Sequence, residues 1–241
     1  MAKRLVFLLL LAGALLVGFL PFVRHQSADS KYVSYRADLR KDDLKLYWKD
    51  EHGQLFRSLG SLESWLSAKG KQLKFAMNGG MYKAGNIPVG LFIQEQRVLA
   101  PLNTATGTGN FYLTPNGIFY VTIDNKVAIC RTEAFPGTEK IRFATQSGPL
   151  LVIDGRIHPA FNSASQNLNI RNGIGILPDG SLLLVMSREK VNFYEFAAYF
   201  RAQGCRNALY LDGFVSRAYA PEKEWLQTDG DFGVIIGLTA R

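Results

Sequence analysis

The sequence predicts an α+β protein: a sheet-dominated single domain with mixed or antiparallel strands and a few helices, preceded by an amino-terminal apolar segment. Two features carry this prediction. Most of the chain consists of short apolar stretches separated by turn-forming dipeptides, a pattern typical of hairpins. Only two stretches have the periodicity of an amphipathic helix. A length of 241 residues with 47% hydrophobic residues is enough for one well-cored domain, or at most two.

The predicted strands are short, mostly apolar runs. They cover residues 44–48, 73–77, 89–94, 97–100, 110–113, 117–123, 126–130, 141–146, 150–153, 173–177, 181–186, 208–211 and 234–238. Four dipeptides between these runs are strong hairpin signals, because their residue types tolerate the positive φ angles of tight turns. They are Asn116-Gly117, Asp124-Asn125, Asp154-Gly155 and Asp179-Gly180.

Two helices are expected. In residues 192–204, apolar side chains recur at helical spacing, so one face should lie on the sheet. Those side chains are Phe193, Phe196, Ala197 and Phe200. Gly204 is well placed to end this helix. The second helix covers residues 61–70, with Ser61 as its N-cap and Gly70 as its stop.

The amino terminus indicates export. Lys3 and Arg4 precede an uncharged apolar run over residues 5–23, so residues 1–23 are expected to be a signal peptide or a membrane anchor. Residues 24–36 are polar and read as a tether, which leaves residues 37–241 as the folded domain. The domain should therefore face the periplasm or the exterior. It is either secreted or held at the inner membrane through residues 5–23.

A net charge of +8 requires an explanation. The basic residues are spread along the chain without an arginine-rich run, and export argues against nucleic acid as a partner. An anionic substrate or envelope polymer fits better. The two cysteines, Cys130 and Cys205, either pair in an oxidising compartment or serve as small core residues. The histidines form no spaced set of metal ligands, and a metal or other cofactor is left unassigned.

Several polar residues stand where apolar runs begin or end. Asp212 and Gly213 follow the run at residues 208–211, and Asp212 is either a catalytic carboxylate or a turn cap. Asn78, Gly79 and Gly80 follow the run at residues 73–77. They form either an anion-binding nest or an ordinary hairpin turn.

Three further residues are candidates for a chemical role. Arg171, among amide residues, is either a bidentate phosphate clamp or a structural arginine paired with an acid such as Asp212. Ser147, before Gly148, is not in a Gly-x-Ser-x-Gly elbow, so it is not a nucleophile of that kind. Glu195 lies three residues after Asn192, which favours a capping box over a catalytic role.

The order of these motifs resembles the phosphodiester glycosidase family over roughly residues 73–238. The resemblance implies an active site built from Asn78, Arg171 and Asp212. Substrate contacts are expected from Gly79, Gly80, Ser147, Gly148, Asn172, Gly213, Ser216 and Arg217. The family often has three glycines and a serine after the last aspartate, whereas this chain has Gly213, Phe214, Val215, Ser216 and Arg217. Arg217 is therefore expected to supply a phosphate contact.

The expected function is that of an exported hydrolase that cleaves a sugar-1-phosphodiester. Asp212 would stabilise an oxocarbenium-like transition state or act as acid or base. No second carboxylate stands out, and Glu195, Asp154 and Asp231 are the candidates. The alternative is a non-catalytic module that binds envelope glycans or phosphoglycolipids. A catalytic site requires Asn78, Arg171 and Asp212 to converge on one pocket, and a merely structural protein would leave them scattered.

Overall fold

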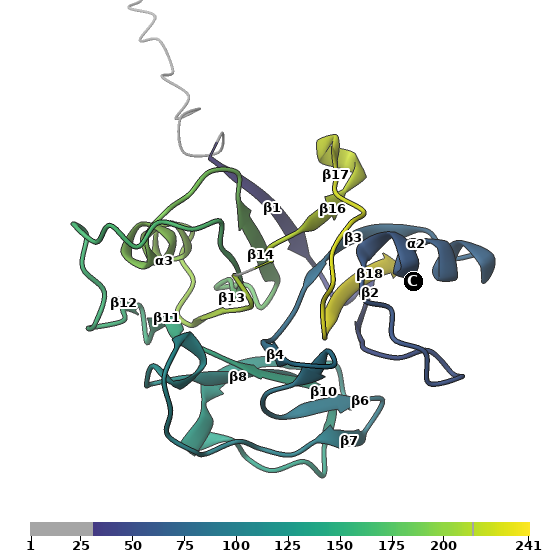
Figure 1. Cartoon of the computed structure of the whole chain (residues 1–241), viewed down its shortest axis with the longest axis horizontal. Helices are drawn as coiled ribbons and strands as arrows, with labels where there is room; N and C mark the ends of the chain where they lie inside the picture. The colour runs from purple at the N-terminus through teal and green to yellow at the C-terminus, as the bar shows by residue number, and fades with distance from the viewer. Residues whose placement is uncertain (1–30, 214) are drawn as a thin grey trace, which may run out of the picture.

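The computed structural model describes residues 31–213 and 215–241, and these residues form a sheet-dominated domain of antiparallel strands (Figure 1). This confirms the predicted fold class. The first sheet has the strand order β1 (Tyr32–Ala37), β14 (Leu182–Ser187), β13 (Asn172–Ile176), β15 (Ala208–Tyr210), β11 (Leu150–Ile153) and β12 (Arg156–Ile157). Each pair of neighbouring strands is antiparallel.

Two further sheets complete the architecture. One has the order β7 (Arg97–Ala100), β6 (Phe92–Gln94), β10 (Ile141–Ser147), β8 (Gly117–Thr122) and β9 (Val127–Arg131). The other has the order β17 (Trp225–Leu226), β16 (Ala218–Ala220), β3 (Leu73–Asn78), β18 (Ile235–Ala240) and β2 (Asp42–Tyr47). A two-stranded ribbon joins β4 (Tyr82–Lys83) to β5 (Ile87–Pro88). Three 3-10 turns are η1 (Asn110–Tyr112), η2 (Thr132–Ala134) and η3 (Pro221–Lys223).

The three large sheets enclose one buried apolar cluster. Leu184 from the first sheet, Phe119 from the second and Phe75 from the third all belong to it. Alternate residues of each strand point inward, so three faces bury their apolar side chains against one another. The site described below lies at one end of these sheets.

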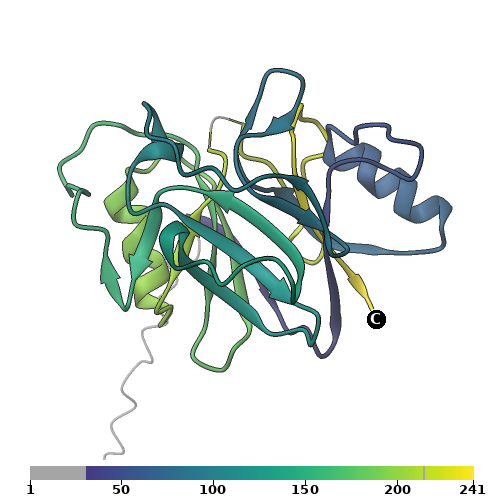
Figure 2. The same cartoon turned by 90° about the horizontal axis from the view of Figure 1, so that it is seen from below.

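The two α-helices of the described chain cover outer faces at opposite sides of the molecule (Figure 1 and Figure 2). Helix α3 (Phe193–Ala202) buries Phe196 and Phe200 beside the first sheet, as predicted. Its N-cap is Asn192, whose side chain accepts from the Glu195 amide at 2.8 Å. Glu195 itself binds Lys31 at 2.9 Å, so only half of the expected capping box forms.

Helix α2 (Leu59–Ala68) covers the third sheet and begins earlier than predicted. Its N-cap is Ser58, whose hydroxyl accepts from the Ser61 amide at 3.1 Å. Ser61 is therefore in the first turn, and the predicted N-cap was wrong by one turn. Gly70 follows the helix with a φ of 71°, and the Lys71 amide bonds back to the Leu66 carbonyl at 2.9 Å, which ends the helix as expected.

Three of the four predicted hairpin turns form. Asp124-Asn125 joins β8 to β9, Asp154-Gly155 joins β11 to β12, and Asp179-Gly180 joins β13 to β14. Asn116-Gly117 does not form a hairpin, because the segment before it is η1 and not the predicted strand at residues 110–113. The Asn116 side chain instead donates to the Phe111 carbonyl at 2.9 Å, which stabilises that 3-10 turn.

The chain enters the sheet earlier than predicted. Residues 32–36, assigned to the tether, belong to β1, which pairs along its whole length with β14. The sequence did not indicate this strand, because polar side chains on its half-exposed face interrupt the apolar pattern. The predicted signal peptide or anchor at residues 1–23, and residues 24–30 of the tether, lie outside the described residues. Within residues 31–213 and 215–241, no helix is both long and apolar enough to span a bilayer.

Cys130 and Cys205 are free cysteines. Cys205 is buried among apolar side chains beside α3, whereas Cys130 is partly exposed on β9. The structure thus favours the core-residue alternative over a disulfide. Burial raises the pKa of the Cys130 thiol to about 11 and that of Cys205 to about 12.

Candidate active site

Two strands from different sheets meet through a pair of asparagines. Asn78 is the last residue of β3 and Asn172 is the first residue of β13. The Asn172 side-chain amide donates to the Asn78 carbonyl at 2.7 Å and to its side-chain oxygen at 3.0 Å. Both side chains are buried. Buried amides are stable only when they are hydrogen-bonded, so this pair fixes where the two sheets join.

The same pair positions the chain around Asp212. The Asn78 side-chain amide donates to the Asp212 carbonyl at 2.6 Å, and the Asp212 amide donates to the Gly79 carbonyl at 3.0 Å. The Asn78 side-chain oxygen also accepts from the Arg217 amide at 2.9 Å. These bonds hold both ends of the 212–217 loop against the end of β3.

Asp212 lines a cavity of about 450 Å³. The other lining residues come mainly from the ribbon after β3: Met81, Tyr82, Lys83, Ala84, Gly85, Asn86 and Asp231. Burial, followed by the charges of Asp212 and Asp231, raises the pKa of Tyr82 to about 12. The cavity therefore combines two carboxylates, a neutral phenol and a lysine.

The Asn-Gly-Gly stretch is not a hairpin turn. Gly79 continues the end of β3, and its amide donates to the Val234 carbonyl at 2.7 Å. A Cβ at Gly80 would lie 2.3 Å from the Thr145 hydroxyl and 2.7 Å from the Gln146 carbonyl. Gly80 is needed because the chain passes closely over β10, whereas a Cβ at Gly79 would lie 2.9 Å from the Val234 side chain. Neither glycine has a positive φ.

Position 213 must be a glycine because the Tyr210 side chain packs directly against it. A Cβ at Gly213 would lie 1.5 Å from the Tyr210 hydroxyl, a distance that excludes any side chain. Gly213 also forms a backbone hydrogen bond with Tyr210. Burial raises the pKa of Tyr210 to about 12, so the phenol stays protonated at neutral pH and supports the loop after Asp212 as a neutral group.

Arg171 contacts the Tyr210 hydroxyl and is fully buried. Its Nε donates to the Val191 carbonyl at 2.9 Å and its Nη1 to the Tyr210 hydroxyl at 3.3 Å. The guanidinium carbon stacks 3.7 Å from the Phe193 ring centre. Burial lowers the pKa of Arg171. The guanidinium has no exposed surface, so its observed contacts are those of a structural support and not those of the predicted phosphate clamp.

The other predicted contact residues divide into two groups. Asn172, Ser216 and Arg217 bond, together with the Asp212 carbonyl, to one another or to Asn78, and these bonds are called the asparagine network. The Arg217 Nε, however, is paired with Asp229 at 2.9 Å. Ser147, the last residue of β10, and Gly148, which follows it, are buried and are not among the residues that line the cavity. The Ser147 hydroxyl has no hydrogen-bond partner among the described residues.

Of the three carboxylates considered as a second acid, only Asp231 shares the cavity with Asp212. Its side chain accepts from the Arg57 Nε at 2.7 Å and from the Asn86 side-chain amide at 2.9 Å. Glu195 is engaged by Lys31, and Asp154 sits in the β11–β12 turn. The sequence did not predict Tyr82 and Lys83 as lining residues of the site, because a Tyr-Lys pair after two glycines matches no functional motif.

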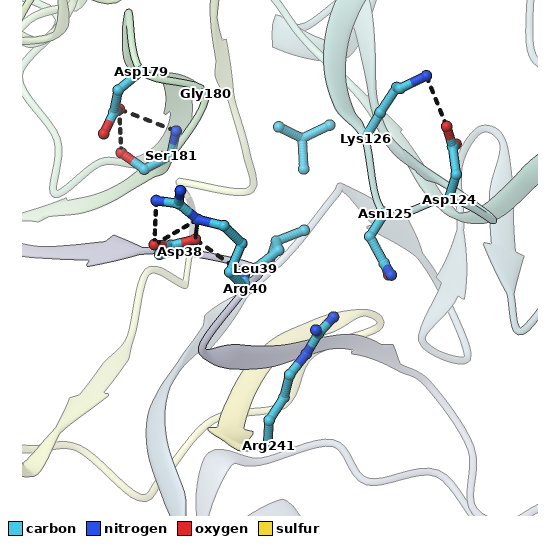
Figure 3. Close-up of a pocket in the computed structure, with 11 residues that line it drawn as sticks. Asp38, Leu39, Arg40, Asp124, Asn125, Lys126, Asp179, Gly180, Ser181 and Arg241 are labelled. Atoms are coloured by element: carbon cyan, nitrogen blue, oxygen red, sulfur yellow. Dashed lines mark hydrogen bonds and ion pairs between the residues drawn. The ribbon is translucent and has the colours of Figure 1, made fainter.

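A second cavity, of about 650 Å³, lies at the opposite end of the sheets (Figure 3). It is lined by the β1–β2, β8–β9 and β13–β14 turns. Its carboxylates are ion-paired: Asp38 with Arg40, Asp124 with Lys126, and Asp179 with Arg36. In the part of the chain that the structure describes, no group of three or more His, Cys, Asp or Glu side chains could hold a metal ion.

The site can be compared with known proteins. A family model described as phosphodiester glycosidase matches residues 71–232, which span every element of the asparagine network and the cavity. The chain belongs to this family. Membership confirms the resemblance drawn from the order of the sequence motifs, which begins and ends within a few residues of the matched range.

Individual proteins resemble this chain in sequence or in fold. The chain is 38% identical over 187 residues to the uncharacterized protein YigE of Escherichia coli strain K12, covering 77% of this chain and 73% of that protein. The fold is similar to the catalytic domain of zebrafish N-acetylglucosamine-1-phosphodiester alpha-N-acetylglucosaminidase, with a TM-score of 0.55, 13% identity and coverage of 88% and 89% of the two chains. A Burkholderia pseudomallei protein provisionally described as exported has a TM-score of 0.53 at 12% identity, covering 86% of this chain and 73% of its own.

Proposed function

We propose that this chain is an exported hydrolase that cleaves a sugar-1-phosphodiester between the anomeric carbon and the phosphate. The observation that carries the proposal is the convergence of Asn78, Asn172 and Asp212, from three separate segments, beside one cavity. Membership of the phosphodiester glycosidase family supports the reaction class. The zebrafish relative is named for action on an N-acetylglucosamine-1-phosphodiester, which supports the substrate class.

Asp212 is the catalytic carboxylate in this proposal. Cleavage at an anomeric carbon passes through a state with positive charge on the sugar ring, and a fixed carboxylate stabilises that charge. Asn78 holds the Asp212 carbonyl and Gly79 holds the Asp212 amide, so the backbone that carries the carboxylate is fixed before the reaction. Lys83, which lines the cavity, takes the role of anion contact that the buried Arg171 cannot fill.

The test is turnover of defined substrates by the purified full chain. Methyl phosphodiesters of N-acetylglucosamine 1-phosphate and glucose 1-phosphate serve as probes, with free sugar and methyl phosphate as the products measured. We expect turnover by the wild type, and a fall in kcat of about 10²-fold or more in Asp212→Asn, the usual contribution of one positioned acid–base group. The thermal unfolding midpoint of this variant should stay close to that of the wild type.

Two results would contradict the proposal. Near-normal turnover in Asp212→Asn would make Asp212 a turn residue. Tight binding of the probes without turnover by the wild type would favour a binding module for envelope glycans. The location is tested separately: a carboxy-terminal reporter that works only in the cytoplasm should be silent, because residues 1–23 are proposed to direct export.

A further inference from the structure

Asp231 has a geometry that an ordinary surface carboxylate lacks. It lines the cavity that Asp212 also lines, although its side chain is 61% exposed. Both of its hydrogen bonds, from Arg57 and from Asn86, go to the same oxygen, Oδ1. Its Oδ2 has no hydrogen-bond partner among the described residues. One oxygen is thus fixed to the protein while the other remains available to a molecule in the cavity.

Arg57 and Asn86, which donate to Asp231, are fixed by further hydrogen bonds. The Asn86 carbonyl accepts from the Trp48 indole at 2.7 Å, and the Asn86 side chain also donates to the Phe232 carbonyl at 3.0 Å. The Arg57 carbonyl accepts from the Phe232 amide at 2.6 Å. This arrangement braces Asp231 from two remote segments.

Arg57 and Asn86 also have backbone conformations that are rare for residues other than glycine. The φ angles of Arg57 and Asn86 are 61° and 58°, in the left-handed region that residues other than glycine rarely adopt. Such conformations persist only where surrounding contacts impose them, and they cluster at functional sites.

We propose that Asp231 is the second catalytic carboxylate of this cavity and removes a proton from the water that attacks the anomeric carbon. This inference rests on the proposed function of the same cavity. The division of labour follows from exposure: Asp212 is nearly buried and fixed by its backbone, whereas Asp231 is open to water. The hydrogen bonds from Arg57 and then Asn86 lower the pKa of Asp231, so it is ionised at neutral pH, as a proton acceptor must be.

The step balances without another reactant. The oxygen of water bonds to the anomeric carbon, and the bond between that carbon and the phosphate oxygen breaks. The electron pair of that bond leaves with methyl phosphate when the probe is a methyl diester. The proton of the water passes to Asp231 and then to solvent, which leaves the free sugar as the second product.

The first experiment uses Asp231→Ala and Asp231→Asn in the full chain, assayed on the methyl diesters. We expect kcat to fall by about 10²-fold or more in both variants, with KM changed much less. Azide attacks without needing a base, so it should restore sugar release in Asp231→Ala and yield a glycosyl azide that mass spectrometry detects. Asp124→Asn is the matched control, because it removes an ion-paired carboxylate at the opposite end of the sheets, and its kcat should be unchanged.

The second experiment uses the pH dependence of kcat/KM in Arg57→Gln. Removing the main cause of the lowered pKa should raise the pKa of Asp231, so the acid limb of the profile should move to higher pH. The other charged or titratable groups at this cavity, Asp212, Tyr82 and Lys83, are unchanged in this variant. A purely structural Asp231 would lose activity without a shifted limb and without azide rescue.

Three outcomes overturn the assignment. Wild-type turnover that survives in Asp231→Asn overturns the role of Asp231 and leaves the proposed function intact. Lost turnover with neither azide rescue nor a shifted acid limb makes Asp231 structural. A wild-type chain that cleaves neither methyl diester overturns the proposed function and, with it, this role for Asp231.

Discussion

The two ends of the sheets are held together in opposite ways. At the end with the asparagine network, hydrogen bonds connect residues far apart in the chain: Asn78 and Asp212 are separated by 134 positions, and Asn78 and Asn172 by 94. At the end with the hairpin turns, the ion pairs lie on the surface; two of them join near neighbours in the chain, and a third joins Asp179 to Arg36 of β1. Asp38 binds Arg40, two positions away, and Asp124 binds Lys126. The first arrangement is buried and the second is exposed.

The two ends also differ in their cavities, and the larger cavity is not the one beside the buried polar network. The cavity at the hairpin end is larger, at about 650 Å³ against about 450 Å³, yet it is lined by solvated ion pairs that contribute little to stability. The smaller cavity lies beside polar groups buried at a cost and satisfied only by one another. Long-range polar contacts of that kind mark the end of the molecule where the chemistry is proposed.

The largest expected effect is on the buried network. Asn78→Ala removes the side-chain bonds to the Asp212 carbonyl, the Arg217 amide and the Asn172 side chain, so these buried polar groups lose hydrogen bonds. We expect the free energy of unfolding to fall by about 3 kcal/mol, measured by urea denaturation. The control is Asn162→Ala, which removes an exposed, local bond to the Ala164 amide and should cost less than about 0.5 kcal/mol. Equal losses in the two variants would mean that the buried, long-range bonds of Asn78 contribute no more to stability than an exposed, local bond.

A glycine at each end gives the next largest effect. Gly80→Asn places a side chain against the backbone of β10 and should cost about 2 kcal/mol by overpacking. Gly180→Asn, in the β13–β14 turn, should cost only a few tenths of a kcal/mol, because nothing lies within 4 Å and Asn tolerates its φ of 82°. Urea denaturation of both variants measures the difference. A greater loss at Gly180 would mean that the turn, and not the close approach at Gly80, limits stability.

The smallest effect is expected for a carboxylate of the hairpin end. Hydrogen bonds from Lys126 and then Thr122 lower the pKa of Asp124 to about 2. Because this folded-state pKa is depressed, any stability it contributes is present above the unfolded pKa near 4 and is lost as pH falls through about 2. The small gap between the urea midpoints of the wild type and Asp124→Asn at pH 7 should therefore close near pH 2. It should also shrink in 1 M salt, and a gap that persists under both conditions would contradict a solvated ion pair.

Local sequence signals predicted most of the framework. The helix at α3, its Asn192 N-cap and the turn at Asp154-Gly155 depend on neighbouring residues, through apolar spacing, a capping side chain and tolerance of positive φ. The same signals failed where a strand is very short or polar. β1, β4, β5, β12, β16 and β17 were missed for this reason, since their pairing partners and not their own residues stabilise them.

At the site, the sequence by itself determined which residue types stand at the ends of the strands, and the motif order pointed to Asn78, Arg171 and Asp212. Only the tertiary structure decided which of the charged groups faces the cavity. Arg171 has the chemistry of a phosphate clamp but is fully buried against Tyr210. Asp231 lies in no distinctive motif, but it accepts hydrogen bonds from Arg57 and Asn86, which are 174 and 145 positions away in the chain. The physical reason is that exposure and pairing are set by contacts between remote segments, which no local pattern encodes.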